Sequence, residues 1–206
     1  TTSFFPSKPL GCYGDGGACF TNDDSLAKAM REISIHGQEK RYKHNKIGVN
    51  GRLDTLQAAV LLSKINIFDK EVALRESIGK KYTQKLKGRG FINTPFVESN
   101  NNSVYAQYTV QIENRSRVMN YLKEKGIPTT IHYPLLISDQ DALNNNKKGL
   151  LNKILGREIY KSHSLKIAEE LVHKVLSLPM HPMLSENDQD LIIDSLINAN
   201  NKINKS

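Results

Sequence analysis

The sequence is poor in cysteine, has no long apolar run and starts without a basic leader. Its 206 residues include two cysteines, Cys12 and Cys19. Two are too few for a disulfide framework, and they provide no second pair of ligands for a zinc site. No apolar segment reaches the roughly eighteen residues that a membrane-spanning helix needs, and residues 1–5 lack the regions of a signal peptide. We therefore expect a protein of the reducing cytoplasm without a membrane partner.

The positive charge of the sequence raises the question of a nucleic-acid partner. The formal net charge is +8, from 29 lysines and arginines against 21 acidic residues. The basic residues alternate with acids, as at Arg31-Glu32 and Lys70-Glu71, and the sequence has neither an RNP-like aromatic motif nor a zinc-finger spacing. We therefore expect solvated helix faces rather than binding to nucleic acid. A local positive potential that attracts an anionic small substrate is the alternative.

Apolar periodicity and turn residues predict an alternation of helices and strands. The predicted helices cover residues 25–35, 53–87, 116–125, 165–173 and 186–203. The predicted strands cover residues 1–5, 18–21, 104–112, 127–133 and 175–178. The polar stretch 36–44 has no periodicity and is predicted to be a loop. The helix at 53–87 is long enough to connect two domains, and the elements after residue 100 predict a compact α/β domain.

Lys8 has unusual neighbours for a lysine. Phe4, Phe5 and Pro6 precede it, Pro9 follows it, and four glycines lie within residues 11–17. Most lysines are solvated surface charges, but this setting fixes the backbone and can desolvate the amine, which favours its neutral, nucleophilic form. A nucleophilic lysine forms a Schiff base with a carbonyl, and pyridoxal phosphate is the commonest such carbonyl carried by a protein. Lys8 is therefore a candidate for binding pyridoxal phosphate.

A second candidate site precedes the longest predicted helix. Gly48 and Gly51 bracket Asn50, and Arg52 stands directly before the helical pattern. A helix N-terminus favours anions, because its free backbone N–H groups and its dipole both attract negative charge. Asn50 and Arg52 are therefore placed where an anionic group could bind.

Several separated motifs occur in the order that they have in one known family. They are SFFPSKPLG (3–11), GDGGA (14–18), HGQ (36–38), RYKH (41–44), VNGRLD (49–54), QAA (57–59), SVYAQY (103–108), IHYP (131–134) and LSLPMHP (176–182). Together they resemble the sugar-nucleotide aminotransferases of the DegT/StrS type, which are fold-type-I pyridoxal-phosphate enzymes. Within that family the chain is most similar to enzymes that aminate a 3-keto UDP-sugar, such as 3-oxo UDP-N-acetylglucuronate, for O-antigen or capsule synthesis.

The resemblance implies an α/β fold and a place in the C-terminal half of such an enzyme. Family members carry a substantial segment before the matching lysine, whereas here one short predicted strand precedes Lys8. That segment would hold the acid that pairs with the pyridine nitrogen, the stacking aromatic and the helix N-terminus under the phosphate. We therefore expect residues 1–52 to be the C-terminal remnant of the large cofactor-binding domain. Residues 53–88 would be a bridging helix and residues 89–206 a small α/β domain.

Carried onto the matching positions, the resemblance gives three residues roles towards the cofactor. Lys8 would bind pyridoxal phosphate as a Schiff base and then act as the general acid-base of the 1,3-proton shift. Ser3 would donate its hydroxyl to the cofactor phosphate; on residue type alone it would be a strand-end serine that caps a backbone group. Asn50 would reach the phosphate in the neighbouring subunit's site, although without the family it would be a turn residue between glycines. The resemblance therefore implies a homodimer with shared active sites.

Three further residues would contact the substrates, a nucleotide sugar and glutamate as the amino donor. Arg52 would face the sugar nucleotide, because a guanidinium can bind a carboxylate or diphosphate oxygens bidentately. His132 and Tyr133 would line the substrate pocket towards the partner's site. On residue type alone, Arg52 would be a surface arginine and His132-Tyr133 would be packing residues. No pair of histidines has the spacing of metal ligands, so we expect no metal site.

One further departure from the family and two alternatives accompany this interpretation. The family often continues after the IHYP motif with a second histidine, which residues 135–140 lack, so the sugar is left open. A related dehydratase is disfavoured, because those enzymes have a histidine in place of Lys8. The other alternative is a truncated, catalytically incompetent fragment that acts only as a folding or dimerisation module.

Overall fold

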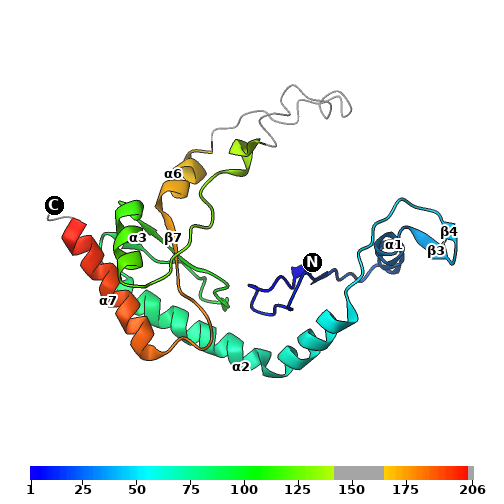
Figure 1. The fold of residues 1–206 in the computed structure, drawn as a ribbon, viewed down its shortest axis with the longest axis horizontal. Helices are drawn as coiled ribbons and strands as arrows, with labels where there is room; N and C mark the ends of the chain where they lie inside the picture. The colour runs from blue at the N-terminus through cyan, green and yellow to red at the C-terminus, as the bar shows by residue number, and fades with distance from the viewer. Residues whose placement is uncertain (142–164, 204–206) are drawn as a thin grey trace. The chain divides into compact units, whose positions relative to one another are not determined.

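The structure is a computed structural model, and it describes residues 1–141 and 165–203. Contacts divide the chain into two units, Thr1–Ala73 (unit 1) and Leu74–Ser206 (unit 2). The boundary falls within α2 (Thr55–Leu86), a helix of 32 residues (Figure 1), which confirms the long helix predicted from the sequence. The division into residues 1–52, 53–88 and 89–206 stays a prediction. None of the helices in the described part of the chain combines the length and apolarity needed to cross a membrane.

Unit 1 is built from short elements before the first half of α2. These are β1 (Thr2–Ser3), β2 (Gly17–Ala18), α1 (Asp24–Ser34), β3 (Gln38–Lys40) and β4 (Lys43–His44). Asp23 caps α1, because its side chain accepts hydrogen bonds from the backbone N–H groups of Ser25 and Leu26 at 2.8 and 3.1 Å. The hydrogen bond from the Ser25 hydroxyl, with these two, lowers the pKa of the Asp23 carboxyl. The predicted helix at 25–35 is thereby confirmed.

The prediction of a loop over residues 36–44 is wrong. Strands β3 and β4 pair antiparallel, with Gln38 opposite His44. The strands are too short and polar to show a hydrophobic alternation, so the sequence carries no strand signal there. Side chains stabilise the pairing instead, because Glu39 forms an ion pair with Lys43 (2.9 Å) and accepts a hydrogen bond from Asn45. The hydrogen bond from Lys43, followed by that from Asn45, lowers the pKa of the Glu39 carboxyl.

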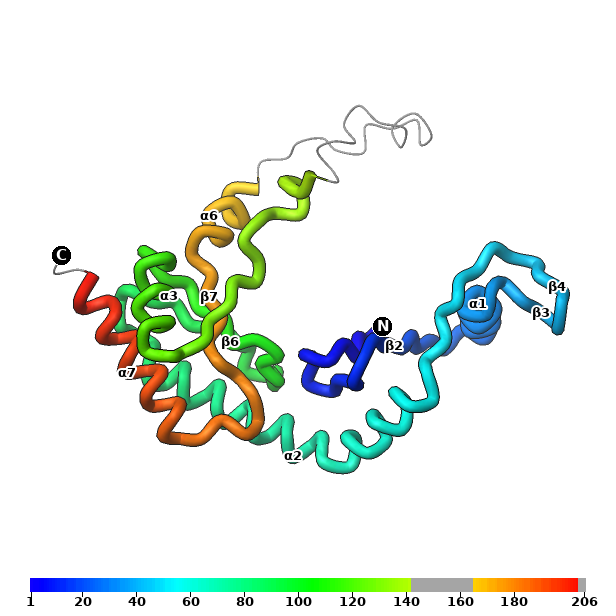
Figure 2. The backbone as a smooth tube through the Cα atoms, viewed as in Figure 1, coloured from blue at the N-terminus to red at the C-terminus, as the bar shows by residue number. Residues whose placement is uncertain are grey.

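The described residues of unit 2 contain an antiparallel sheet with strand order β5-β6-β7, in which β6 and β7 lie side by side (Figure 2). Besides the second half of α2, it comprises β5 (Ile92–Asn93), β6 (Tyr108–Ile112), α3 (Arg115–Glu124), the 3-10 helix η1 (Ile137–Asp139), α6 (Lys166–Lys174), β7 (Val175–Leu178) and α7 (Glu186–Ile203). The helices at α3, α6 and α7 and the strand at β7 confirm the sequence predictions. The short strand β5 was not predicted.

The core of unit 2 lies between one face of the sheet and the helices. Every second residue of β6, namely Tyr108, Val110 and Ile112, is buried in this core. Helix α3 packs beside α7 (Figure 1), and the Gln189 side chain of α7 donates to the Ile78 carbonyl of α2 at 2.8 Å. Unit 2 therefore has a contiguous hydrophobic core of its own.

The predicted strand at 127–133 is also wrong. In the described structure this segment makes one isolated bridge, in which Thr130 pairs with Ser177 of β7. The two backbones exchange hydrogen bonds of 3.2 and 2.8 Å there. Pro128 has no backbone N–H to donate to a sheet, which limits how far the pairing extends despite the β-branched composition.

Two tyrosines of unit 2 are buried together with their hydroxyl groups. The rings of Tyr82 and Tyr108 stack, with 4.8 Å between their centroids. The Tyr82 hydroxyl donates to the Pro179 carbonyl at 3.0 Å, and the Tyr108 hydroxyl lies 2.7 Å from Oγ1 of Thr83. Burial raises the pKa of both hydroxyls, that of Tyr108 to about 12.

We therefore expect the protein to lose stability in alkaline solution. An unfolded tyrosine ionises near its ordinary pKa of 10, whereas Tyr108 stays neutral in the folded state until about 12. The contribution of Tyr108 is fully present below the lower pKa and is lost as pH rises through the higher one. At about pH 11 the loss from Tyr108 alone is about 1.4 kcal/mol, measurable by urea unfolding against a reference at about pH 9. Tyr108→Phe should weaken this dependence; an unchanged dependence, or the same weakening in the exposed Tyr42→Phe, would contradict it.

Candidate active site

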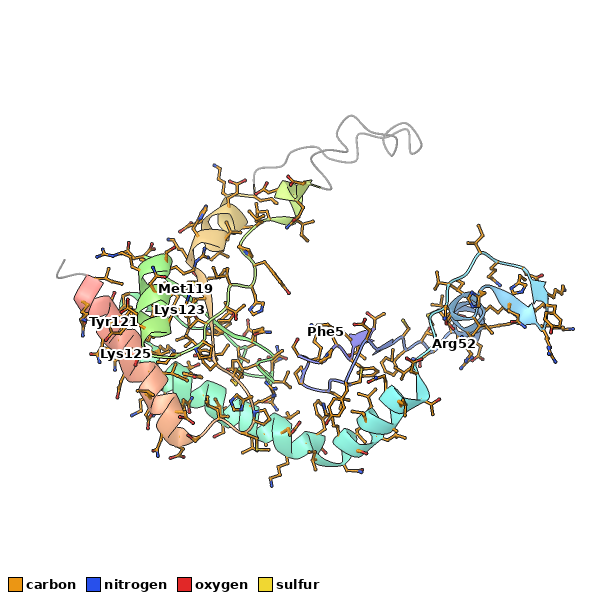
Figure 3. All side chains as sticks on the ribbon, viewed as in Figure 1. Phe5, Arg52, Met119, Tyr121, Lys123 and Lys125 are labelled. Atoms are coloured by element: carbon orange, nitrogen blue, oxygen red, sulfur yellow. The ribbon has the colours of Figure 1, made fainter. Side chains whose placement is uncertain are left out.

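Lys8 is exposed and lies in a loop whose two ends are fixed to each other. Strands β1 and β2 pair below the loop, with Thr2 opposite Ala18. Above them, the Phe4 N–H donates to the Gly16 carbonyl and the Cys12 N–H donates to the Phe4 carbonyl, both at 2.8 Å. Figure 3 labels Phe5 in this loop; its carbonyl accepts from the Lys8 N–H at 2.8 Å. We call residues 4–16 the lysine loop. It presents the Lys8 amine to solvent from a restrained backbone.

Ser3 lies at the base of the lysine loop. Its Oγ accepts a hydrogen bond from the Phe5 N–H at 3.2 Å. This is the backbone-capping contact expected from residue type alone. Because the hydroxyl is the acceptor in this contact, its hydrogen can still be donated to another group.

Asn50 and Arg52 contact each other on the segment that leads into α2. The Arg52 Nε donates to Oδ1 of Asn50 at 3.1 Å, and both side chains are exposed. Figure 3 labels Arg52 on this segment. With Nε engaged, the two terminal nitrogens of the guanidinium form the edge that can hold an anion bidentately. The sequence had placed these residues together, but it carried no sign of the contact between them.

Backbone hydrogen bonds fix this segment to the end of α1. The Val49 N–H donates to the Ile33 carbonyl at 2.9 Å, and the Gly51 N–H donates to the Ser34 carbonyl at 2.8 Å. The approach requires glycine at position 48, because a Cβ there would lie 2.1 Å from the backbone nitrogen of Gly37. The glycines of the VNGRLD region therefore set the position of Asn50 and Arg52.

His132 and Tyr133 lie in unit 2, on the sheet face opposite the core. The His132 Nδ1 is 2.8 Å from Oγ of Ser177, which in turn is 2.7 Å from Oγ1 of Thr109. The Tyr133 ring is 71% exposed and meets the His132 ring edge-on, with 5.4 Å between centroids. Because Nδ1 is engaged with Ser177, Nε2 is the ring nitrogen that can contact a ligand. Sequence reasoning missed Ser177 and Thr109, which orient this histidine.

The six predicted site residues thus form three local groups. Lys8 lies in the lysine loop with Ser3 at its base, and Asn50 and Arg52 contact each other in the same unit. His132 and Tyr133 form a third group in unit 2. Within the described residues, no group of three or more His, Cys, Asp and Glu side chains is arranged to hold a metal ion; His163 lies outside those residues.

Two side chains of α2 contact the lysine loop and were given no role from the sequence. Gln57 accepts a hydrogen bond from the Tyr13 N–H at 2.8 Å, and Lys64 donates to the Gly11 carbonyl at 2.6 Å. Residues seven apart lie on one face of a helix. That spacing was visible in the sequence, but it does not say which segment the face contacts.

A sequence profile of the DegT/DnrJ/EryC1/StrS aminotransferase family matches residues 1–197. This chain belongs to that family. It is 50% identical over 197 residues to the UDP-2-acetamido-2-deoxy-3-oxo-D-glucuronate aminotransferase of Pseudomonas aeruginosa, a match that covers 96% of this chain and 50% of the relative. The chain therefore spans about half the length of the curated relatives it matches.

Solved structures of aminotransferases share its fold. A DegT/DnrJ/EryC1/StrS aminotransferase from Brucella abortus is 41% identical, with a TM-score of 0.84, over 95% of this chain and 49% of that one. NtdA from Bacillus subtilis, solved with bound cofactor PMP, is 26% identical, with a TM-score of 0.81, over 96% of this chain and 44% of that one. The predicted α/β class, as part of a DegT-type aminotransferase fold, is thereby confirmed.

Proposed function

We propose that this chain is the part of a cytoplasmic, pyridoxal-phosphate-dependent sugar-nucleotide aminotransferase that carries the cofactor-binding lysine. Its substrate would be a 3-keto UDP-sugar, with glutamate as the amino donor, and its product would serve O-antigen or capsule synthesis. One observation carries the proposal: the Lys8 amine is exposed on a restrained loop, in a chain that is 50% identical in sequence to an aminotransferase of a 3-oxo UDP-sugar acid. The three groups of site residues then have complementary tasks.

The lysine loop fits pyridoxal phosphate in its chemistry. Lys8 offers a primary amine in solvent, and the Ser3 hydroxyl at the base of the loop retains a hydrogen that a phosphate oxygen can accept. When bound, the cofactor supplies an aldehyde for the amine and a ring that withdraws electrons from the reacting carbon. Lys8 Nζ, once free again, would be the general acid-base that takes up and returns the proton of the 1,3-shift. Asn50 would add an amide donor to the phosphate of the neighbouring subunit.

The other groups fit an anionic sugar nucleotide. The terminal nitrogens of Arg52 can bind a carboxylate or two diphosphate oxygens, and Asn50 holds the guanidinium in place through Nε. His132 would donate to or accept from a sugar hydroxyl through Nε2, since Ser177 fixes its ring through Nδ1. The exposed Tyr133 would offer a ring face and a hydroxyl beside it.

The surface of unit 1 supports a homodimer and a further protein segment around it. Among residues 1–73, all of which the structure describes, Cys12 is the one buried hydrophobic side chain. Ile47 is 99% exposed and Leu56 is 80% exposed. Leu62, Ile65 and Ile67, in the first half of α2, are exposed as well. Large exposed apolar surfaces mark interfaces. Pairing alone would also cover this surface, so an inert dimerisation module is the alternative.

Measurements of cofactor binding and amino transfer distinguish the enzyme from the dimerisation module. The purified chain is incubated with pyridoxal phosphate, alone and with the N-terminal half of the Pseudomonas aeruginosa relative in trans. We expect a visible absorbance band and, after borohydride reduction, a pyridoxyl group on Lys8 by peptide mass spectrometry. The reconstituted protein should move the amino group of glutamate to a 3-keto UDP-sugar. A dimer that acquires neither band nor label in either mixture would establish the module and reject the enzyme.

Arg52→Lys tests the anion contact. Lysine keeps the charge but loses the bidentate edge and the Nε contact to Asn50. We expect the KM for the sugar nucleotide to rise about tenfold with a smaller effect on kcat, because the lost contact acts in substrate binding. Arg89→Lys is the matched control, since the Arg89 Nε also donates to an oxygen, the Lys85 carbonyl at 2.8 Å. An equal change of KM in both variants would contradict a specific role for Arg52.

A further inference from the structure

We propose that Lys64 is a positioning residue that clamps the lysine loop onto α2 and so aims the Lys8 amine. This inference rests on the proposed function, because it gives Lys64 its purpose through Lys8. Lys64 Nζ donates to the Gly11 carbonyl at 2.6 Å and lies 4.9 Å from the centroid of the Tyr13 ring. One ammonium group therefore holds the loop by a charge-assisted hydrogen bond and by a cation–π contact.

Gly11, which Lys64 contacts, is coupled to Lys8 by close backbone packing. A Cβ at Gly11 would lie 2.7 Å from the Pro6 carbonyl oxygen and 2.8 Å from that of Phe5. Gly11 therefore lies directly against the residues that precede Lys8. Displacement of Gly11 would move Phe5, whose carbonyl accepts the Lys8 N–H at 2.8 Å. The path from Gly11 to the Lys8 backbone therefore consists of two backbone contacts, Gly11 with Phe5 and Phe5 with Lys8.

Two further residues contact the lysine loop from the same side. Gln57 belongs to α2, and Leu53 lies on the segment that leads into it. Gln57 accepts from the Tyr13 N–H at 2.8 Å, so Tyr13 is held by its backbone at Gln57 and by its ring at Lys64. Leu53 Cδ1 would be 3.1 Å from a Cβ at Gly16, at the other end of the loop. Lys64 and Gln57 are seven residues apart, about 10 Å along the helix. The loop is thus fixed at separated points, and a turn about any one of them is prevented.

Lys64 is suited to positioning the lysine loop, because its charge is not used in an ion pair in the part of the chain that the structure describes. Within the described residues no carboxylate forms an ion pair with it, and its side chain is half buried beside the loop. Its charge is therefore directed at a carbonyl oxygen and a ring face of the lysine loop. An apolar side chain of similar length can fill the space but cannot hold the carbonyl.

The test compares Lys64→Met with Lys64→Arg, which keeps both a donor and a cation, and with Lys70→Met, an exposed control on the same helix. The first measurement is amide hydrogen exchange of the cofactor-free chain. We expect Lys64→Met to raise the exchange rates of the Lys8 and Cys12 amides about tenfold, the usual scale of a lost hydrogen bond to a charged group. The amide of Val110 in β6 should be unchanged, and Lys64→Arg should restore the protection.

The second measurement is the rate at which pyridoxal phosphate and borohydride label Lys8, in the mixture in which the wild-type chain is labelled. Lys64→Met should slow labelling about tenfold, in parallel with the exchange effect, and Lys64→Arg should restore it. Unchanged exchange in Lys64→Met would overturn the clamp. Faster exchange with unchanged labelling would overturn its role in aiming Lys8. A wild-type chain that is never labelled at Lys8 would instead reject the proposed function, and this inference with it.

Discussion

Replacing Lys8 with alanine is expected to abolish covalent attachment of pyridoxal phosphate and to lower amino transfer by at least about a hundredfold, the smaller end of the effect of a lost general acid-base. The side chain is exposed, and it makes no hydrogen bond through Nζ in the described structure. Its removal should therefore leave the folding of the chain unchanged. The readouts are the visible absorbance band, the borohydride-fixed label and the rate of amine transfer from glutamate.

Lys28→Ala is the control for this experiment. Lys28 is an exposed lysine of the same unit, 3.8 Å from Glu32 across one turn of α1. Its removal tests whether loss of any positive charge lowers activity. Lys8→Arg adds a second comparison, because arginine retains the charge but its guanidinium is a poor nucleophile. If Lys8→Ala retains the label or the transfer rate, another amine performs these steps and the assignment of Lys8 is wrong.

The long helices could be predicted from the sequence because their stabilisation is local and periodic. Helix α7 starts with a capping-box-like contact, in which the Asp188 N–H donates to Ser185 Oγ at 3.1 Å while the Ser185 hydroxyl donates to Asp188 Oδ2 at 2.6 Å. Helix α3 ends before Gly126, whose φ of 72° suits glycine. Such signals lie within a few residues of the element they define. They therefore need no knowledge of the rest of the fold.

The errors fall where a segment has no apolar pattern, or where a contact distant in sequence decides the structure. The hairpin of β3 and β4 depends on side-chain contacts such as Glu39 with Lys43, and not on an apolar pattern. The segment at 127–133 has β-branched residues, but the sheet accepts it at one bridge to Ser177, 47 positions from Thr130. Propensity describes a residue's preference, whereas the partner strand decides whether a strand forms.

The candidate site shows the same difference between what the sequence predicts and what it does not. The identities of Lys8, Asn50 and Arg52 follow from motifs and from the family resemblance, since those depend on residue type and order. The contacts that orient them do not, because Lys64 lies 53 positions from Gly11 and Ser177 lies 45 positions from His132. A sequence can therefore propose the groups for the chemistry, while the residues that hold those groups become visible in the structure.

Gly79→Val is expected to have the largest effect on stability. Gly79 is buried in α2, and a Cβ at this position would lie 2.3 Å from Cε2 and 2.4 Å from Cδ2 of the Tyr105 ring. Tyr105 cannot move aside easily, because it belongs to the core and its ring lies 5.4 Å from that of Tyr108. We expect a loss of about 3 kcal/mol and a Tm lower by about 10 °C, measured by thermal and urea unfolding.

Helix propensity alone predicts the opposite result, since glycine inside a helix is about 1 kcal/mol less favourable than alanine. Ser77→Val, at an exposed position two residues away, should therefore change stability by less than about 0.5 kcal/mol. A double-mutant cycle with Tyr105→Ala identifies the obstacle, because removing the ring should recover part of the loss caused by Gly79→Val. If the two changes are additive, the ring is not what excludes a side chain. A favourable coupling would instead mean that glycine is required at position 79 so that Tyr105 can pack directly on the backbone of α2.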